Sequence, residues 1–376
     1  MLQYAREDFA GVEVRPLELT VVIPTLNEAE NIRSIVEKLA LALAGIEWEA
    51  IFVDDASTDG TPDRVAEAAA FDRRIRLIRR FGRRGLSSAV MEGFLASTAP
   101  VVAVMDGDGQ HDERILPQLH DAVRDGRCDL AVGTRYSGGG SIGEWSPARA
   151  RISDFATRLA RPLLIKTPLS DPMSGFFAIR REAVLEAVPR LSSVGYKILL
   201  DLVASTPRPL AVSEVPYAFR DRASGESKLD GAVALEYLEL LLDKAIGRWI
   251  PVKLVKFSAV GALGLGIHLV LLSIFLQSAD ASFTVAQTIA VIGAMTFNFE
   301  LNNRFTYRDR RLRGAAWAKG LASFYLVCSL GALANIGVGS LAFDSAHDWW
   351  VAGLIGALIG SVWNYVASGW LTWSRR

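Results

Sequence analysis

Hydrophobic and polar positions repeat with two different periods along the first 250 residues. Apolar runs of five or six residues, bounded by glycine, proline or aspartate, predict β-strands at Leu19–Pro24, Glu49–Asp54, Ile75–Arg80, Val101–Met105 and Asp129–Gly133. Between them, apolar residues spaced three or four apart predict helices over 28–43, 60–70, 85–98 and 112–125. This alternation of strands and helices predicts an α/β domain built on a mostly parallel, doubly wound sheet.

The last third of the chain has a different pattern. It contains four apolar stretches, at about 257–277, 283–299, 320–343 and 349–373. Each is close in length to the roughly 20 residues that a helix needs to cross the core of a bilayer. Lysine and arginine gather before the first, between the second and third, and after the fourth, and the other two connections contain neither. The positive-inside rule then predicts an integral, multi-pass membrane protein with both termini and the polar domain on the cytoplasmic side.

A segment with helical periodicity, 231–250, joins the two parts. Apolar residues recur along it from Val233 to Trp249, with charged residues between them, which predicts an amphipathic helix. Two placements are open, along the bilayer surface or packed on the polar domain. The expected organisation is a cytosolic domain over 1–230, this helix over 231–250 and a four-helix transmembrane domain over 251–376.

Composition and missing motifs exclude several classes of protein. Lysine plus arginine equals aspartate plus glutamate, at 41 each in 376 residues, so no charge excess indicates nucleic-acid binding. The two cysteines, Cys128 and Cys328, lie in different halves and do not suggest a disulfide framework. The first strand is followed by no GxGxxG, and there is no Walker lysine motif, which disfavours dinucleotide oxidoreductases and P-loop enzymes. The first residues lack the long apolar core of a signal peptide.

The clearest chemical signal follows the fourth predicted strand, in Met105-Asp-Gly-Asp-Gly-Gln110. In extended chain, side chains at alternate positions point the same way, so Asp106, Asp108 and Gln110 are expected to present oxygen atoms to one point. Mg²⁺ and Mn²⁺ prefer oxygen ligands and are usually held by one or two carboxylates together with substrate phosphates. An acidic pair is often only a solvated turn, but the first two strands also end in polar residues. Because such sheets bind ligands at the carboxyl ends of their strands, we expect a metal and phosphate site there.

Seven motifs lie in order between residues 20 and 230: Val22-Ile-Pro-Thr-Leu-Asn-Glu28, Val53-Asp-Asp-Ala-Ser-Thr-Asp-Gly-Thr61, Met105-Asp-Gly-Asp-Gly-Gln-His111, Gly133-Thr-Arg-Tyr136, Asp171-Pro-Met-Ser-Gly-Phe-Phe177, Gly195-Tyr-Lys-Ile-Leu-Leu200 and Gly225-Glu-Ser-Lys228. With them the chain resembles the family 2 glycosyltransferases, and among these the polyprenyl-phosphate sugar transferases of the dolichyl-phosphate mannose synthase type. The apolar part resembles a GtrA-like four-span domain through 255–261 and 298–307. The resemblance implies a GT-A fold, Rossmann-like, for the polar domain.

The resemblance also implies roles for individual residues. The donor nucleotide sugar is expected at Pro24, Thr25, Asn27, Glu28, Val53, Asp55, Asp106, Gly107, Asp108, Gln110, Lys197, Arg222 and Lys228. The acceptor phosphate is expected at Arg135, Arg149 and Ser153, because guanidinium groups match phosphate oxygens. Mg²⁺ or Mn²⁺ is expected at Asp106, Asp108 and Gln110. The residues expected to act in catalysis are Asp106, Asp108, Arg135, Arg149, Arg222 and Lys228.

Several of these residues have a second interpretation. Asn27 is equally suited to be a helix N-cap, and Asp54 to be a turn residue, which leaves Asp55 for the ligand. His111 is interpreted as a surface residue or as a support for the metal ligands. Asp171 is expected to orient either the sugar or the acceptor arginines.

The resemblance implies transfer of a hexose, with mannose from GDP-mannose favoured, to a polyprenyl phosphate at the cytosolic membrane face, with inversion. A lipid phosphate is already anionic, so no general base is expected. The alternatives are transfer from UDP-glucose or a UDP-aminosugar to undecaprenyl phosphate, and a flippase for lipid-linked sugar with an accessory transferase domain. A processive polysaccharide synthase is disfavoured, because Ala245 stands where its Gln-x-x-Arg-Trp motif needs glutamine before Arg248-Trp249. A homo-oligomer remains open.

Overall fold

The computed structural model describes residues 15–82, 85–136, 138–141, 147–192, 195–220, 231–277, 282–346 and 349–374. Within these ranges the side chains of 147–150, 152, 231–232 and 332–357 are not described. The chain divides into two compact units, 1–245 and 246–376. The boundary falls in the last turn of the helix predicted to join the two parts.

The first unit is built on a sheet that has seven strands within the described residues, in the order β3-β2-β1-β4-β6-β5-β7. The strands are β1 Leu19–Thr25, β2 Trp48–Asp54, β3 Ile75–Arg79, β4 Val101–Val104, β5 Leu130–Thr134, β6 Phe177–Arg180 and β7 Val212–Pro216. The five strands predicted from the sequence are present, each within one residue at either end. β6 and β7 were not predicted. β6 runs antiparallel to both neighbours, β4 and β5, and the other neighbouring pairs are parallel.

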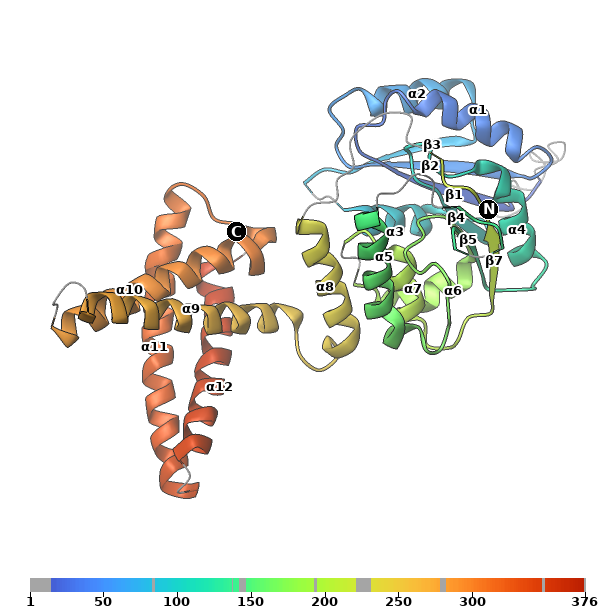
Figure 1. Ribbon diagram of the computed structural model, residues 1–376. Coiled ribbons are helices and arrows are strands. Elements are labelled where there is room, and N and C mark those ends of the chain that lie inside the picture. The colour runs from blue at the N-terminus through green and yellow to red at the C-terminus, as the bar shows by residue number, and fades with distance from the viewer. Residues whose placement is uncertain are drawn as a thin grey trace, which may run out of the picture. The chain divides into compact units, whose positions relative to one another are not determined.

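Helices cover both faces of this sheet (Figure 1). One face packs against α1 Ile32–Ala42, α2 Thr61–Phe71 and α4 Leu116–Arg124, and the short 3₁₀ helix η1 Glu113–Ile115 precedes α4. The other face packs against α3 Leu86–Ala96, α5 Pro147–Ala160, α6 Arg181–Ala187 and α7 Ile198–Ser205, with 3₁₀ turns η2 Arg161–Leu164 and η3 Val188–Arg190 after α5 and α6. Alternate residues of each strand face opposite sides, so Val21 and Ile23 enter one core and Val22 the other.

The parallel strands β1, β2 and β4 end at the same edge of the sheet. Thr25 pairs with Asp54, and Val22 pairs with Val104. The polar residues that follow these strands therefore start from neighbouring points, as expected. One premise was wrong, because β4 ends at Val104 and the next residues form a turn in which Gly109 has a φ of 76°. The side chains of Asp106, Asp108 and Gln110 therefore do not follow the alternation of an extended strand.

The helix that joins the two parts, α8 Gly231–Ile246, packs on the first unit. Lys244 Nζ lies 2.6 Å from the carboxylate of Asp201, and the Tyr237 hydroxyl donates a hydrogen bond of 2.5 Å to the carbonyl of Ala156. Of the two placements that the sequence left open, the structure has the packed one. The opposite side of the helix still exposes the leucines Leu235, Leu238 and Leu242.

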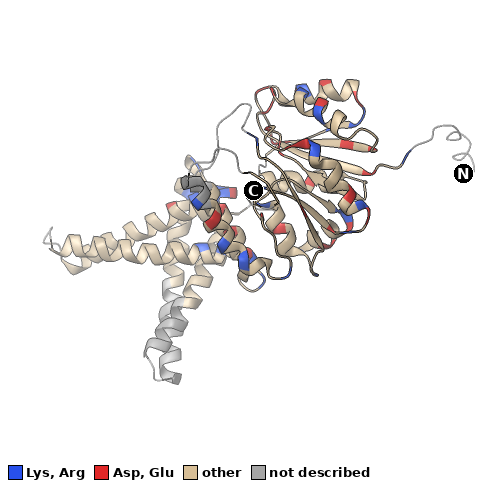
Figure 2. Cartoon of the chain, turned by 45° about the vertical axis from the view of Figure 1, so that its right-hand side comes forward, with Lys and Arg blue, Asp and Glu red and all other residues tan. Residues whose placement is uncertain are grey.

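In its described part, the second unit consists of the helices α9 Val252–Gln277, α10 Phe283–Leu301, α11 Ala315–Ala346 and α12 Trp349–Ala367. Two five-residue π-helical turns, η4 Asn302–Thr306 and η6 Ser368–Thr372, continue α10 and α12, and a 3₁₀ turn, η5 Arg308–Arg310, follows η4. The four helices occupy the four predicted spans, and Figure 2 shows how little charge α9 and α10 carry along their length. Among the described residues, α9 is long and apolar enough to cross a bilayer, while crossing by the others stays a prediction.

Candidate active site

The loops that follow β1 and β2 are tied together. The backbone N–H of Asn27 donates a hydrogen bond of 2.8 Å to Ser57 Oγ, and the side-chain oxygen Oδ1 of Asn27 accepts one of 3.0 Å from the backbone N–H of Thr58. Asn27 has a φ of 59°, in the left-handed region that asparagine tolerates better than most residues. Since α1 begins only after Asn31, the N-cap interpretation of Asn27 is wrong. Its side chain instead orders the loop after β2.

Asp54 and Asp55 have different surroundings, and the difference agrees with the interpretation of Asp54 as a turn residue. Asp54 is fully buried and accepts hydrogen bonds from the backbone N–H and the hydroxyl of Ser57, which makes it a turn residue. The Asp55 carboxylate accepts from Arg80 Nη1 at 2.5 Å and from the Gly85 N–H at 2.8 Å. Burial raises the pKa of Asp55. Asp55 therefore lies at the site edge in an orientation fixed by Arg80.

The β1 and β2 residues predicted to bind the donor differ in accessibility. Val53 is fully buried in the core, so only its backbone is available to a ligand. The Thr25 hydroxyl is buried and has no hydrogen-bond partner within the described residues. Pro24 is half-buried, and Glu28 accepts a hydrogen bond of 2.7 Å from the Asn31 side chain. These residues are brought to the edge where Asp55 and Asp106 also lie.

The Asp106–Gln110 turn packs closely against the end of β1 and against Gly175. A Cβ atom added at Gly107 would lie 3.1 Å from the side chain of Thr25 at the end of β1. The Asp106 carboxylate lies against Gly175, where an added Cβ atom would come within 3.1 Å of its Oδ2. Asp108 Oδ1 accepts a hydrogen bond of 3.1 Å from the Gln110 N–H. Two carboxylates are thus held in a turn of fixed shape.

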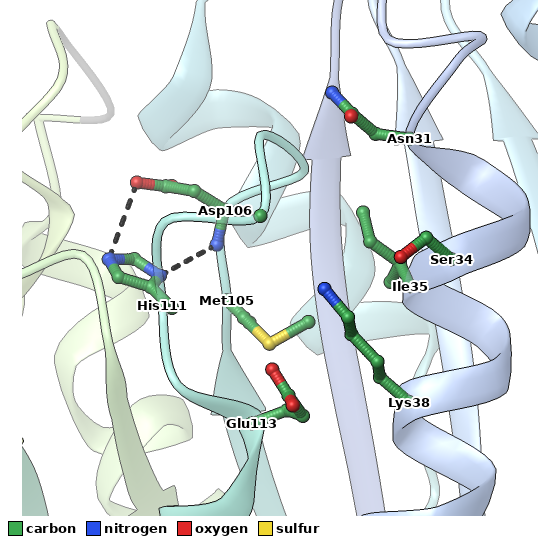
Figure 3. A pocket seen from close by; sticks show the side chains of 9 residues that line it. Asn31, Ser34, Ile35, Lys38, Met105, Asp106, His111 and Glu113 are labelled. Atoms are coloured by element: carbon green, nitrogen blue, oxygen red, sulfur yellow. Dashed lines mark hydrogen bonds and ion pairs between the residues drawn. The ribbon is translucent and has the colours of Figure 1, made fainter. Parts of the chain in front are cut away.

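His111 supports this turn from inside the protein. Its Nδ1 accepts a hydrogen bond of 3.1 Å from the Asp106 N–H, and its Nε2 lies 3.7 Å from Asp106 Oδ2 (Figure 3). The ring stacks on Phe176 with centroids 4.8 Å apart. Burial lowers the pKa of His111 to about 4, so the ring is neutral at pH 7. Because Nδ1 is an acceptor, the proton is on Nε2, which faces the carboxylate. The surface interpretation of His111 is wrong, and the structure agrees with the supporting one.

A small cavity lies between α1 and this turn (Figure 3). Its volume is about 50 Å³, and its walls are formed by Asn31, Ser34, Ile35, Lys38, Met105, Asp106, Gly109, His111 and Glu113. Ligand pockets for molecules the size of a nucleotide have volumes of roughly 300–1,000 Å³. The cavity is therefore part of the packing behind the turn rather than a donor site.

The donor set at the turn fits a hard divalent cation that is shared with a ligand. No three His, Cys, Asp or Glu side chains form a metal cluster within the described ranges, so these residues do not provide a closed protein cage. Mg²⁺ is typically held by one or two carboxylates plus substrate phosphates, which matches Asp106 and Asp108. The Gln110 amide nitrogen donates to the Arg220 carbonyl at 3.2 Å, so its amide oxygen is the atom suited to a cation.

Arg135 and Asp171 form a buried ion pair beyond β5. Arg135 Nε and Nη2 lie 2.7 and 2.9 Å from the two oxygens of Asp171, and the two side chains are 8% and 0% exposed. The guanidinium carbon lies 5.4 Å from the centre of the Phe219 ring. Of the two interpretations of Asp171, the structure agrees with the one in which it orients an arginine.

Of the remaining predicted phosphate-binding residues, two lie in α5, one lies directly before α7 and two lie outside the described residues. The Tyr136 hydroxyl and Ser153 Oγ are 3.1 Å apart, which joins α5 to the residue after Arg135. Arg149 lies one helical turn before Ser153 in α5, and its side chain is not described. Lys197 immediately precedes α7, with its Nζ 3.5 Å from the Met173 carbonyl. Arg222 and Lys228 lie outside the described residues.

The comparisons with known proteins cover both units. Residues 20–187 match glycosyl transferase family 2, and residues 256–373 match the GtrA/DPMS transmembrane domain. A dolichol-phosphate mannosyltransferase of Pyrococcus furiosus is 34% identical over 363 residues, which cover 95% of this chain and 100% of that relative. The chain belongs to the dolichol-phosphate mannosyltransferase family.

Other relatives match the catalytic part of this glycosyltransferase. A dolichol-phosphate mannosyltransferase of Saccharomyces cerevisiae is 38% identical over 234 residues, which cover 60% of this chain and 86% of the relative. Among solved structures, glucosyl-3-phosphoglycerate synthase of Mycobacterium tuberculosis in complex with Mn²⁺, UDP and glucosyl-3-phosphoglycerate is 24% identical. It has a TM-score of 0.45 and covers 61% of this chain and 80% of that one. The family matches and the relative of Pyrococcus furiosus confirm the family resemblance, and the mostly parallel sheet with helices on both faces, followed by a helical second unit, confirms the GT-A-like fold with a GtrA-like helical region.

Two contacts at the site of this glycosyltransferase were missed by sequence reasoning. They are the support of Asp55 by Arg80 and the close approach of Gly175 to Asp106. The first had a signal, since Arg80 directly follows β3 and so stands at the same sheet edge. The second depends on how the segment before β6 folds back, which no local pattern indicates.

Proposed function

We propose that this glycosyltransferase transfers mannose from GDP-mannose to a polyprenyl phosphate of the dolichyl type. The observation that carries the proposal is the match to a dolichol-phosphate mannosyltransferase along that relative's entire length. The match supports both halves of the proposed reaction. The first unit matches glycosyl transferase family 2 and is proposed to bind the nucleotide sugar, and the second matches the GtrA/DPMS transmembrane domain and is proposed to hold the enzyme at the membrane that contains the lipid acceptor.

The donor is proposed to bind at the ends of β1, β2 and β4. Asp106 and Asp108, with the amide oxygen of Gln110, would hold Mg²⁺ or Mn²⁺ together with the donor diphosphate. When bound, such an ion neutralises the charge that develops on the departing diphosphate. His111 keeps Asp106 in place from behind through the two contacts to its backbone and carboxylate. Lys197, Arg222 and Lys228 are proposed to approach the same diphosphate.

The acceptor phosphate is proposed to bind Arg135, Arg149 and Ser153. One of its oxygens forms a bond to the anomeric carbon, on the face opposite the diphosphate, while the bond from that carbon to the diphosphate oxygen breaks. The bonding electrons leave with GDP, and the configuration at the anomeric carbon is inverted. The attacking oxygen carries no proton, so no general base is needed. Catalysis then depends on positioning and on stabilisation of charge.

The proposed location is the cytoplasmic face of a membrane, with a multi-pass second unit and both termini on the cytoplasmic side. Basic residues at the ends of the apolar helices support this orientation through the positive-inside rule. The exposed leucines of α8 are compatible with contact between the catalytic unit and the lipid surface.

The proposal is tested with the Asp108→Ala variant and a matched control, Asp121→Ala, whose carboxylate is on the outside of α4. Membranes containing each variant receive labelled GDP-mannose or UDP-glucose with polyprenyl phosphate and Mg²⁺ or Mn²⁺. We expect mannosyl transfer by the native protein and by Asp121→Ala, and none by Asp108→Ala. Electron paramagnetic resonance should show weakened Mn²⁺ binding by Asp108→Ala. Full transfer by Asp108→Ala would refute the role of the turn, and transfer from UDP-glucose alone would refute the donor.

A further inference from the structure

The second unit contains the same sequence pattern twice. Phe257, Val260, Leu263 and Gly264 of α9 recur with the same spacing 67 residues later in α11, as Phe324, Val327, Leu330 and Gly331. A second pattern lies at the end of α10, within Phe297–Tyr307. It consists of an asparagine between two aromatic residues, followed by a threonine and a final aromatic residue. The same pattern recurs 66 residues later at the end of α12, within Trp363–Trp373. The repeat therefore covers a pair of helices, α9–α10 and α11–α12.

The backbone repeats an uncommon feature at equivalent positions. The π-helical turns η4 and η6 begin 66 residues apart, and π-helical turns are rare in proteins. The residues that end them, Tyr307 and Trp373, have φ/ψ values of −111°/36° and −113°/36°. Each donates its backbone N–H to the first residue of its turn, Asn302 at 2.8 Å and Ser368 at 3.0 Å. The two turns thus have the same conformation.

The packing inside each hairpin also repeats. The carboxamide of Asn298 in α10 lies on Gly264 of α9, and the carboxamide of Asn364 in α12 lies on Gly331 of α11. A Cβ atom added at either glycine would overlap the carboxamide oxygen of the opposing asparagine. Each contact therefore requires glycine in the first helix of its hairpin, and small residues of this kind let apolar helices approach closely.

The contacts between the two hairpins are also equivalent in pairs. A contact from the first helix of one hairpin to the second helix of the other has a counterpart in the opposite direction. The rings of Phe257 in α9 and Tyr365 in α12 have centroids 5.8 Å apart, and those of the equivalent Phe324 and Phe299 have centroids 5.7 Å apart. The equivalent residues Tyr307 and Trp373 stack on each other, with centroids 4.1 Å apart and planes 8° from parallel. A pairing between two copies around a twofold axis has this property, because residue i of one copy meets residue j of the other in both directions.

We infer that the second unit is a duplicated helical hairpin whose inner face is built to pair with a second copy of itself, supplied by the same chain. The axis passes through the Tyr307–Trp373 stack, where both hairpins begin and end and from which they run in different directions (Figure 1). In a membrane, an axis along the bilayer normal gives both copies the same orientation. Each hairpin then crosses twice, and the C-terminus returns to the side from which α9 enters.

The positions at which the copies differ fit the same scheme. Glu300 accepts a hydrogen bond of 2.7 Å from Trp317 Nε1, and Asn303 Oδ1 accepts one of 2.8 Å from the Leu312 N–H. Both bonds hold the link between the hairpins, which follows the first copy. The second copy has Val366 and Gly369 at the equivalent positions, which provide no side-chain acceptor for such bonds.

The inference is tested by the accessibility of single cysteines in sealed membrane vesicles, in a Cys128→Ala and Cys328→Ala background. Ser282→Cys and Ala346→Cys mark the far ends of the two hairpins, and Arg308→Cys and Ser374→Cys mark the junction ends. Phe71→Cys, at a position 94% exposed in α2, marks the side of the catalytic unit. A membrane-impermeant maleimide is applied before and after permeabilisation.

We expect labelling of 71, 308 and 374 from one side and of 282 and 346 from the other. Labelling of 282 and 346 from opposite sides, of 374 and 308 from opposite sides, or of all five positions from one side would overturn the inference. The labelling also tests the proposed membrane location, whereas the proposed reaction is tested separately, because mannosyl transfer is measured in the same vesicles and does not enter the labelling result.

A packing measurement tests the duplication itself. Gly264→Ala and Gly331→Ala should lower the melting temperature of the purified full chain by similar amounts, because each disturbs the same contact. Gly261→Ala and Gly266→Ala, where an added Cβ atom meets nothing within 4 Å, should leave it unchanged. A loss at one of the first two glycines but not at the other would contradict the equivalence of the hairpins.

Discussion

Replacement of Asp171 by asparagine is expected to destabilise the catalytic unit more than most single substitutions. Both oxygen atoms of the carboxylate accept hydrogen bonds from Arg135, at 2.7 and 2.9 Å, and neither side chain is appreciably exposed. Removal of one partner leaves a buried guanidinium without its counter-charge, which in buried pairs costs about 3–5 kcal/mol. For a unit of this size each kcal/mol corresponds to a shift of about 2–4 °C, so the melting temperature should fall by roughly 6–20 °C.

The double variant Arg135→Met, Asp171→Leu separates stability from function. A buried ion pair can often be replaced by apolar residues of similar volume without loss of stability, so this variant should melt within a few degrees of the native protein. It should nevertheless transfer no mannose, because the guanidinium proposed to bind the lipid phosphate is gone. Melting is followed by tryptophan fluorescence of detergent-solubilised protein, and transfer with labelled GDP-mannose. Full activity of the double variant would show that Arg135 only stabilises the fold.

Three further predictions concern single positions. Gly107→Ala should weaken Mn²⁺ binding and transfer by about tenfold, because its Cβ atom would push the turn away from the end of β1; unchanged Mn²⁺ titrations would contradict this. His111→Phe keeps an aromatic ring but loses both nitrogens, and should lower Mn²⁺ affinity by roughly 10–100-fold with little change in melting temperature. The hydrogen bonds from Arg208 hold the pKa of Asp129 below its usual value, so their stabilisation is present above the unfolded pKa near 3.8 and is lost as the pH falls. Asp129→Asn should accordingly show a flatter decline in melting temperature below about pH 4 than the native protein.

The elements with strong local patterns were predictable from the sequence. The strands β1 to β5 are apolar runs between turn residues, and the helices between them have clear amphipathic spacing. β6 has only four residues, Phe177–Arg180, and follows the glycine-containing Asp171–Phe177 motif, so its strand signal is short. Its antiparallel direction is decided by its two neighbours in the sheet, which lie far from it in sequence.

At the candidate site, residue types were predictable but their partners were not. The acidic pair after β4 and the choice of Asp55 over Asp54 followed from strand ends and family motifs. Arg80 contacts Asp55 from a segment distant in sequence, and the His111 ring stacks on Phe176 from another, so these contacts appear only in the folded chain. The alternation argument for Asp106, Asp108 and Gln110 was wrong because the strand stops before them, although the turn still keeps the two carboxylates in one short segment.

The antiparallel direction of β6 has a consequence for the chemistry. Phe177, at the start of β6, pairs with Val104 near the end of β4 and with Val132 of β5, so the segment before it enters at the site edge. A parallel strand in this position would have brought its other end there. Residues of this one segment contact both proposed subsites, since Gly175 lies on Asp106 and Asp171 binds Arg135. The segment therefore sets the spacing between the carboxylates proposed to hold the cation and the arginine proposed to hold the lipid phosphate. An attack in line with the departing diphosphate needs that spacing fixed before either substrate arrives.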